Sequence, residues 1–440
     1  MKRFLCLLIA LTFLLGGCTF TGRNVDSLLR PPILSDEQND IWKVLKKSDP
    51  ENSIKLVYPQ RGENRSAILL ANIDDEPGDE AVVFFQTASA VSSAPVGLKI
   101  LDKKDGEWVF VSETVLDGIQ IEDVSLLNVG TGVPIMAVGL NYTSDGTHLI
   151  KILQFDGKEM HTVFSGNYQV KEFYDMDSDG NDDIFIVENP ESEVKIWARA
   201  YRYENNDFKE IGAVTVNPEI THYVTVARGN TAQGKEAVFI DGYKGTELMT
   251  TEILTYDKEK SALVNLTYDG ETPQRYPVDR APVANSMDLT NDGIIEIPGV
   301  RPMPGYDETE EGMLYLTDWY HFTDVGFVKK SSAFVNTALG YIFTYPENWI
   351  GRVSAKALSE NEIVFYEYNA ENEVLGNELL HLRVATRSDW LSKKIPSEYQ
   401  LIDAEGQIVY LAKISGAESS FALSVSKVKE YFDLKKGVPR

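Results

Sequence analysis

Cysteine is almost absent from this sequence of 440 residues, which contains only Cys6 and Cys18. Both lie near the N-terminus, so no disulfide framework can support the rest of the chain. Histidine is also scarce, and no two histidines are close enough in sequence to form a local zinc motif. We therefore expect each histidine to be a solvent-facing or packing residue: His148, His161, His222, His321 and His381.

Positive charge is outweighed by negative charge, with 42 Lys and Arg against 67 Asp and Glu and a formal net charge of −25. Phosphate backbones and anionic lipid surfaces repel such a chain, so we expect no nucleic-acid partner. Catalytic signatures are missing too: there is no Gly-x-Ser-x-Gly elbow, no phosphate-cradling glycine loop and no His-Glu-x-x-His motif. These absences favour a protein that is not an enzyme, although distant segments can still assemble a catalytic group.

One apolar run stands at the N-terminus, directly after Lys2 and Arg3. It covers residues 4–15, which is shorter than the about 20 residues that a membrane-spanning helix needs. A charged start, a short apolar stretch and small residues before a cleavage site are typical of a secretory signal peptide. The sequence Leu-Gly-Gly-Cys that ends at Cys18 resembles the lipobox of bacterial lipoproteins.

This resemblance implies that residues 1–17 are removed and that a lipid on the thiol of Cys18 inserts into the outer face of the cytoplasmic membrane. The lack of disulfides fits a Gram-positive-like envelope. Residues 18–34 would be the tether, because Arg30, Pro31 and Pro32 resist regular structure. An ordinary signal peptide with a chance cysteine is the alternative.

Regular structure is predicted from Ser35 onward. Ser35 and Gln38 have the spacing of a capping box, and the apolar residues behind them predict a short helix over 36–47. Beyond it, short β-branched and aromatic runs alternate with Gly, Asn and Asp turns, which is typical of a mainly β protein. The first of these predicted strands cover residues 54–58, 67–71, 81–85, 97–101 and 108–112.

A nine-residue polar loop recurs between two apolar strands. The clearest copy is Asp-Met-Asp-Ser-Asp-Gly-Asn-Asp-Asp at residues 175–183. Successive loops start 54, 49, 53 and 60 residues apart, which suits one four-stranded unit per copy. The other copies lie at 72–80, 126–134, 228–236 and 288–296, and later hairpin strands of the units are predicted at 151–155, 198–203 and 252–256.

These units resemble the FG-GAP or VCBS type of β-propeller repeat over residues 60–330. The resemblance implies a five-bladed β-propeller, with six or seven blades if divergent copies exist. The strand at 54–58 could close the ring by pairing with the last blade. We therefore assign residues 35–330 to a propeller preceded by a short helix.

Residues 331–440 break the repeat. The segment 339–351 is an alternating strand followed by Pro346 and Trp349, and it resembles the opening of PsbP-like domains. That resemblance implies a small C-terminal α+β domain. We predict strands at 362–368, 379–386, 408–414 and 421–424, a helix over 389–394 capped by Ser388, and a last helix near 425–434.

The loop at 175–183 concentrates oxygen ligands around a tight turn at Gly180. Ca²⁺ takes about six to eight oxygens. The resemblance to FG-GAP repeats implies a structural Ca²⁺ that stiffens a blade, and an Asp-rich turn without an ion is the alternative. The predicted ligands are the carboxylates of Asp175, Asp177, Asp179 and Asp183 and the backbone carbonyl of Asn181.

Two further copies offer fewer ligands. The better set is Asp288, Thr290, Asp292 and Glu296. The poorer set is Asn72, Asp74, Glu76 and Glu80, because Pro77 and Gly78 alter the turn of this loop. We expect the loops at 126–134 and 228–236 to be plain turns, because they lack oxygen ligands.

These features lead to three hypotheses about function. The first is a monomeric cell-surface lipoprotein that acts as a non-catalytic binding or scaffold module for an unknown protein or glycan. The second is an extracytoplasmic hydrolase or lyase that acts on polysaccharide at the propeller channel. The third is an accessory subunit of a membrane transporter or sensor. Buried acids gathered with a His or Tyr at the channel mouth would favour the enzyme, and a flat, solvated mouth the binding module.

Overall fold

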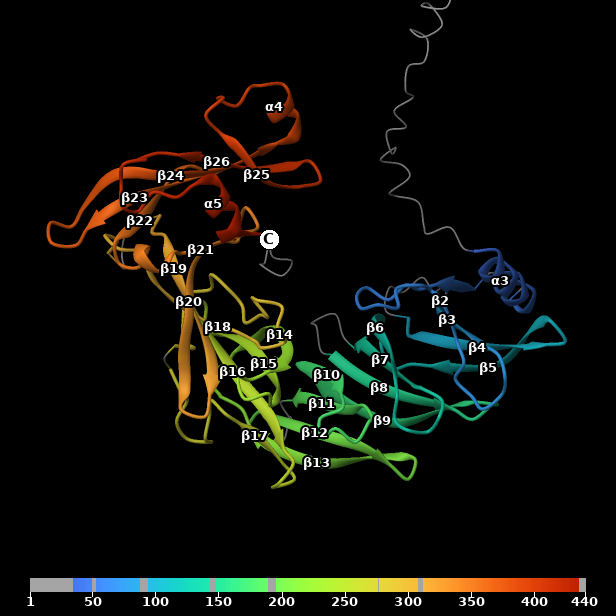
Figure 1. Cartoon of the computed structure of the whole chain (residues 1–440). Coiled ribbons are helices and arrows are strands. Elements are labelled where there is room, and N and C mark those ends of the chain that lie inside the picture. The colour runs from blue at the N-terminus through green and yellow to red at the C-terminus, as the bar shows by residue number, and fades with distance from the viewer. Residues whose placement is uncertain are drawn as a thin grey trace, which may run out of the picture.

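The computed structural model describes residues 35–49, 53–87, 94–142, 148–188, 195–275, 277–307 and 312–434. The predicted signal peptide, Cys18 and the tether lie outside these residues. Within them, no helix is both long and apolar enough to cross a membrane. The described chain is mainly β, as the sequence predicted, and its strands form six antiparallel sheets (Figure 1).

Helix α3 (Asp36–Ser48) opens the described chain and confirms the predicted helix. Oγ of Ser35 accepts a hydrogen bond from the backbone amide of Gln38 at 3.2 Å, and Oε1 of Gln38 accepts one from the amide of Ser35 at 3.1 Å. Both halves of the capping box are therefore formed. Ile41 and Leu45 are fully buried in a cluster with the first sheet, so the apolar stripe of the helix holds it there.

The first sheet consists of β1 (Ile54–Leu56), β2 (Ile68–Ala71), β3 (Glu80–Thr87), β4 (Val96–Lys104) and β5 (Glu107–Val115). Two short strands share one edge of β3: Leu56 of β1 lies opposite Phe85, and Ile68 of β2 lies opposite Val83. The prediction that the strand at 54–58 pairs with the last blade is therefore wrong. Strand β3 is long enough for both short strands to pair with it, one beyond the other along the same edge.

Three four-stranded sheets follow, and the strands of each pair in chain order. The predicted hairpin strands at 151–155, 198–203 and 252–256 are confirmed. Asn205 and Asn206 link two strands of the third sheet with φ of +54° and +62°, the conformation of a two-residue hairpin turn. The strands are β6 (Gln120–Leu127), β7 (Ile135–Asn141), β8 (His148–Phe155), β9 (Met160–Tyr168), β10 (Val170–Tyr174), β11 (Asp183–Glu188), β12 (Trp197–Glu204), β13 (Asp207–Thr215), β14 (His222–Asn230), β15 (Glu236–Lys244), β16 (Leu248–Asp257) and β17 (Ala262–Asn265).

The fifth sheet consists of β18 (Ile297–Pro302), β19 (Tyr315–Thr323), β20 (Gly326–Asn336), β21 (Tyr341–Thr344) and β27 (Phe432–Asp433). The strands pair in that order, so the last strand returns from the far end of the described chain. The predicted domain boundary at residue 331 falls inside β20. Continuous hydrogen bonding therefore joins the repeat region to the C-terminal region.

Each of the first five sheets shares a hydrophobic core with the next. Figure 1 shows these sheets following one another along an arc, with β6, β10 and β14 toward its inner side. Among the described residues, no hydrophobic cluster joins the fifth sheet to the first. One residue pair from each shared cluster illustrates the series: Phe84 and Val138, Ile152 and Ile186, Phe185 and Val238, and Phe239 and Ile297.

The sixth sheet consists of β22 (Val353–Ser359), β23 (Glu362–Asn369), β24 (Val374–Thr386), β25 (Gln400–Glu405) and β26 (Ile408–Ile414), in the order β22-β23-β24-β26-β25. The predicted strands at 362–368, 379–386 and 408–414 are confirmed, while β22 and β25 were not predicted. The 3₁₀ helix η1 (Glu347–Trp349) places Trp349 in the core that this sheet shares with the fifth sheet.

Two local predictions in this region are corrected. Helix α4 (Arg387–Leu391) begins two residues before the predicted helix, because Thr386 rather than Ser388 caps it by accepting from the amide of Asp389. Residues 421–424 form no strand. Instead, the carbonyl of Phe421 accepts from the indole of Trp349 at 2.9 Å, and Ser424 caps α5 (Val425–Tyr431).

Candidate functional site

The loop at 175–183 connects β10 to β11 and folds around one carboxylate. Asp175 accepts hydrogen bonds from the backbone amides of Asp179 and Gly180, each at 2.9 Å. Ser178 and Gly180 have φ of +60° and +92°, a left-handed conformation that turns the chain back on itself. The predicted tight turn is therefore present, and it brings the two ends of the loop together.

Three of the predicted ligands converge in this loop. Carboxylate oxygens of Asp175, Asp177 and Asp183 all lie within 4.8 Å of one another. Asp179 stands outside this group, and its Oδ1 accepts from the amide of Asn181 at 2.9 Å. Carboxylates this close repel one another, so the ionised loop requires a positive charge nearby.

Arg202 on β12 supplies a positive charge that the sequence reasoning did not identify. Its guanidinium forms an ion pair with Asp177, and its Nε lies 3.7 Å from a carboxylate oxygen of Asp179 and of Asp183. The arginine reaches the loop from the strand that pairs with β11, so no spacing within the loop reveals it. The one available signal was a cation between two tyrosines in a predicted strand.

Asp183 is the most buried acid of the loop, with none of its surface exposed. Its Oδ2 accepts from the amide of Met176 at 3.2 Å. Its Oδ1 is buried and has no hydrogen-bond partner among the described residues. Burial raises the pKa of Asp183 to about 7. A buried carboxylate oxygen without a donor, beside two further carboxylates, fits an oxygen-loving cation.

The ninth residue has the same structural role in three loops. Glu80 accepts from the amide of Ile73 at 2.8 Å, and Glu296 accepts from the amide of Leu289 at 2.7 Å, as Asp183 does from the second residue of its own loop. All three acids are buried. The acid at the ninth position thus holds the loop closed, a role that the sequence reasoning assigned only to metal binding.

The loop at 288–296 uses its acids to hold the turn. Asp288 accepts from the amides of Asp292 and Gly293 at 3.1 and 2.9 Å, and Oε1 of Glu296 lies 2.8 Å from Nε2 of His321. Across the described ranges, the acids of this loop do not form a group of three within 4.8 Å. The carboxylates of Asp288, Asp292 and Glu296 therefore do not converge as those of the loop at 175–183 do, and Thr290 has no such group to join.

The loop at 72–80 is also held by its own polar groups. The amide nitrogen Nδ2 of Asn72 donates to the carbonyl of Glu76 at 3.0 Å, and Asp74 accepts from the backbone amide of Glu76 at 2.8 Å. Burial raises the pKa of Glu80. In the described part of the chain, this loop too has no three acids within 4.8 Å of one another.

Loop 175–183 contacts both neighbouring sheets. Asp182 and Asn128 exchange two hydrogen bonds, one from the amide of Asn128 to Oδ2 at 2.8 Å and one from the amide of Asp182 to the carbonyl at 2.6 Å. On the other side, Nζ of Lys258 donates to Oγ of Ser178 at 2.6 Å. A cation in this loop would therefore act on the junction of the second, third and fourth sheets.

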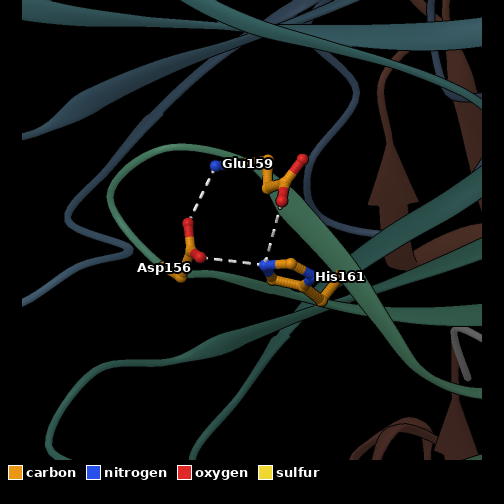
Figure 2. A group of neighbouring side chains, drawn as sticks. All are labelled: Asp156, Glu159 and His161. Carbon is orange, nitrogen blue, oxygen red and sulfur yellow. Dashed lines mark hydrogen bonds and ion pairs between the residues drawn. The ribbon is translucent and has the colours of Figure 1, made fainter.

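A second group of possible ligands, Asp156, Glu159 and His161, lies at the turn between β8 and β9 (Figure 2). All three are exposed, and Nε2 of His161 lies 2.9 Å from Oδ2 of Asp156. The backbone amide of Glu159 and, next, the ring of His161 hold the pKa of Asp156 well below its usual range. The hydrogen bond to Asp156 in turn raises the pKa of His161. Because these contacts already satisfy Asp156, we interpret the group as a turn that is held by its own hydrogen bonds.

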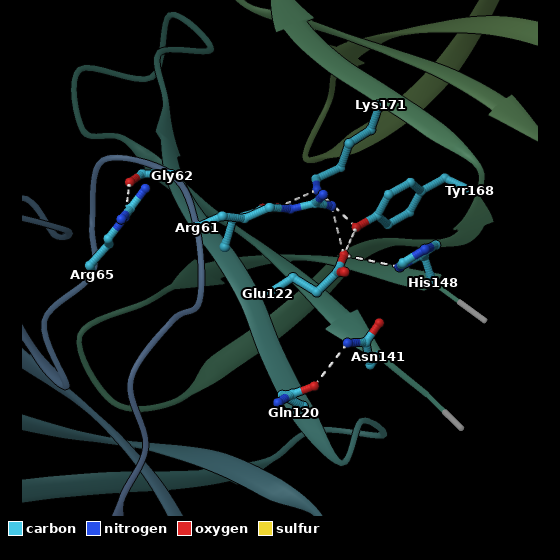
Figure 3. A network of polar contacts seen from close by, with 10 residues as sticks. Arg61, Gly62, Arg65, Gln120, Glu122, Asn141, His148, Tyr168 and Lys171 are labelled. Carbon is cyan, nitrogen blue, oxygen red and sulfur yellow. Dashed lines mark hydrogen bonds and ion pairs between the residues drawn. The ribbon is translucent and has the colours of Figure 1, made fainter. Parts of the chain in front are cut away.

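A third cluster gathers side chains around β6 and β10, two strands toward the inner side of the arc, and Figure 3 shows it from close by. We call it the inner cluster: Arg61, Glu122, Asp123, Tyr168 and Lys171. Its hydrogen bonds form a closed cycle. Arg61 donates to both carboxylates, at 2.9 and 3.3 Å. Lys171 donates to Asp123 at 2.7 Å and to the hydroxyl of Tyr168 at 2.9 Å. That hydroxyl donates to Glu122 at 2.7 Å.

Sequence reasoning missed the inner cluster because its members come from four separate segments. His148, predicted to be a solvent or packing residue, stacks on Tyr168, and its Nδ1 lies 3.1 Å from Oε2 of Glu122. Burial lowers the pKa of Lys171 and raises that of Tyr168. The inner strands therefore gather two buried acids with a tyrosine and a histidine, the combination that was expected for an enzyme.

Comparison with known proteins adds little to this picture. No protein family model and no curated protein matches the sequence. Among solved structures, Sqt1 from Saccharomyces cerevisiae is similar with a TM-score of 0.30 at 9% identity, covering 79% of this chain and 95% of that one. A putative 6-phosphogluconolactonase from Bacteroides uniformis gives a TM-score of 0.30 at 12% identity, covering 69% of this chain and 82% of that one. Rhamnogalacturonan lyase PL11 from Bacillus licheniformis gives 0.24 at 11% identity, covering 63% and 62%. Similarities at this level establish neither a shared fold nor a shared activity.

Proposed function

We propose that the protein is an exported, lipid-anchored binding or scaffold module whose sheets are stabilised by Ca²⁺ at the loop 175–183. The observation that supports this most is the buried Oδ1 of Asp183, which has no hydrogen-bond partner among the described residues, in a side chain that is grouped with the carboxylates of Asp175 and Asp177. The scaffold would be a β-propeller of five blades. Five consecutive antiparallel sheets, stacked along an arc through shared cores, support that arrangement.

Ca²⁺ suits the loop because hard cations prefer carboxylate and carbonyl oxygens. Asp175, Asp177 and Asp183 would supply carboxylates from the converged group, and Asp179 and the carbonyl of Asn181 would complete the set. The ion would neutralise the repulsion within the group, which Arg202 relieves in its absence. Because Asp182 and Ser178 bond to the sheets on either side, the ion would also fix how three sheets are oriented.

Thermal unfolding tests the Ca²⁺ proposal. We expect Ca²⁺ to raise the melting temperature relative to EGTA, since a ligand at about 100 times its Kd stabilises the folded state by about 2.7 kcal/mol. Asp177→Ala should abolish the shift. Asp207→Ala, which removes an exposed aspartate from a hairpin in the same sheet, is the matched control and should keep it. Identical melting curves in Ca²⁺ and EGTA would overturn the proposal.

The lipid anchor is tested separately. The wild-type protein should fractionate with membranes and incorporate radiolabelled palmitate, whereas Cys18→Ser should appear in the soluble exported fraction. Membrane association of Cys18→Ser would contradict anchoring through this residue. The C-terminal sheet, with α5 packed beside it, is proposed to be the PsbP-like module. An interaction with a transporter or sensor would appear as a defined crosslinked partner in intact membranes.

A polysaccharide hydrolase or lyase is the second candidate, and the inner cluster is the observation that favours it. Glu122 and Asp123 are buried beside Tyr168 and His148, as a general acid–base site requires. Both carboxylates are bound by Arg61, however, so neither is free to exchange a proton without opening the cycle. Release of shortened or unsaturated sugars from polysaccharide, lost in Tyr168→Phe, would establish the enzyme over the binding module.

A further inference from the structure

A pocket opens between the inner strands of the second, third and fourth sheets. It has a volume of about 510 Å³ and is lined by four members of the inner cluster, all but Glu122, together with residues of β10 and β14. This volume is within the range of about 300–1,000 Å³ that is typical of ligand sites. We propose that this inner pocket binds a neutral oligosaccharide. The inference deepens the proposed binding function by naming the site and the chemical class of the ligand.

The charges at the floor of the pocket cancel. Arg61 and Lys171 are balanced by Glu122 and Asp123, and each of the four takes part in the closed cycle of hydrogen bonds. A charged ligand would have to break one of these pairs, with a penalty for the partner that is left buried. A neutral ligand can bind over the cycle and leave it intact. The electrostatics of the floor thus favour an uncharged partner.

The walls of the pocket offer polar groups. Ser125, Gln169 and Glu172 line it, and within the described ranges the structure records no hydrogen bond from any of their side chains. Burial raises the pKa of Glu172, which moves this carboxyl toward its neutral form. A hydroxyl and an amide each both donate and accept, and a carboxyl group accepts whether or not it is ionised. Sugar hydroxyls also donate and accept, so they match such walls.

Apolar groups complete the lining. Val224 on β14 is 41% exposed, and Phe173 on β10 is partly buried. Together they offer a surface for the C–H face of a sugar ring, while its hydroxyls meet the polar wall. The whole chain carries a net charge of −25, which opposes an anionic sugar. A neutral oligosaccharide is therefore the class of ligand that fits floor, walls and overall charge together.

Calorimetry with defined tetrasaccharides tests the inference. The neutral probes are chitotetraose, cellotetraose, maltotetraose and xylotetraose. The charged probes are tetragalacturonate and fully deacetylated chitotetraose, at concentrations up to about 10 mM. We expect at least one neutral probe to bind with a Kd below about 1 mM and neither charged probe to bind more tightly. Tighter binding of a charged probe, or no binding of any neutral probe, would overturn the inference.

Two variants locate the site. Val224→Trp should fill the pocket from its exposed rim and weaken binding at least about tenfold. Val328→Trp on β20, at the same exposed fraction of 41% but away from the pocket, is its matched control and should bind normally. Lys171→Met should also weaken binding, because it removes the hydrogen bonds to Asp123 and Tyr168 and so breaks the closed cycle. Equal affinity of Val224→Trp and the wild type would place the sugar elsewhere and overturn the site.

The outcomes separate this inference from the proposed function. A protein whose melting responds to Ca²⁺ but which binds no neutral sugar retains the proposed scaffold and loses the inner pocket. A protein that binds a neutral sugar but whose melting does not respond to Ca²⁺ retains the inner pocket and loses the Ca²⁺-stabilised scaffold. Shortening of the bound sugar would support the pocket and overturn the non-catalytic assignment.

Discussion

Nε of Arg202 lies 3.7 Å from Oδ1 of Asp183, the buried oxygen that no hydrogen bond satisfies. The arginine thus occupies the approach to the carboxylate group where Ca²⁺ is proposed to bind. Two cations cannot share three carboxylates at this spacing without repelling each other. Arg202 and the metal ion are therefore expected to compete.

Arg202→Gln should tighten Ca²⁺ binding and destabilise the ion-free protein. The ion-free loop loses its counter-charge, which we expect to cost about 1–3 kcal/mol, while the metal no longer displaces an arginine. Thermal melts in EGTA and Ca²⁺ titrations measure the two effects.

Arg199→Gln on the same strand is the control for Arg202, because Arg199 pairs with Glu188 and Glu210 and not with the loop. It should leave the Ca²⁺ affinity unchanged. Unchanged affinity in Arg202→Gln would show that the arginine does not compete with the ion.

Gly130→Ala should weaken Ca²⁺ binding, although residue 130 lies in a different loop. A Cβ at this position would lie 2.4 Å from Oδ1 of Asn181, so this side chain of the metal loop would have to move. Gly132→Ala is a closely matched control: both glycines have positive φ, +76° and +87°, but a Cβ at 132 meets nothing within 4 Å. Both substitutions carry backbone strain of about 1 kcal/mol or more. Only Gly130→Ala should change the Ca²⁺ titration, and equal titrations would contradict the coupling.

Glu252 should make the protein less stable as the pH rises. It is 2% exposed, its Oε1 accepts from Asn217 and Asn265, and burial raises its pKa to about 7. The folded state therefore holds a proton that the unfolded state releases above its ordinary value of 4.5. Stability is fully present below that value and is lost as the pH rises to about 7. Denaturant unfolding between pH 4 and 8 measures this slope.

Glu252→Gln should flatten the pH dependence, because the amide keeps an accepting oxygen and cannot ionise. Relative to wild type, it should be more stable above pH 7, by a few kcal/mol at about 1.4 kcal/mol for each pKa unit. A slope that persists in Glu252→Gln would assign the pH dependence to another group.

Tyr168→Phe should destabilise the protein by about 1–3 kcal/mol, because the lost hydroxyl leaves Lys171 and Glu122 each with one partner fewer. Tyr203→Phe is the control. Its hydroxyl donates to Gln154 at 2.8 Å in a half-buried, uncharged pair, so its loss should cost about 1 kcal/mol or less. Equal free energies of unfolding for the two variants would show that the inner cluster adds no stability beyond an ordinary hydrogen bond.

Short-range features of this protein followed from the sequence alone. Ser35 and Gln38 predicted the first helix because a capping box needs only four neighbouring residues. The alternation of apolar runs and turns predicted most strands, and the repeat spacing predicted four-stranded units. The loop at 175–183 was recognisable as a tight turn rich in carboxylates, since its spacing is entirely local.

Long-range features were decided by the tertiary structure. Leu56 pairs with Phe85 in the first sheet, a choice that strand propensity cannot make, because every exposed strand edge offers equivalent backbone groups. Arg202 reaches the Asp-rich loop from a neighbouring strand, and Arg61 and Lys171 meet Glu122 and Asp123 only when three sheets stack. The sequence alone thus determined where oxygen ligands are concentrated along the chain. Folding decided which charges face them, because such contacts depend on strand register and sheet stacking rather than on spacing along the chain.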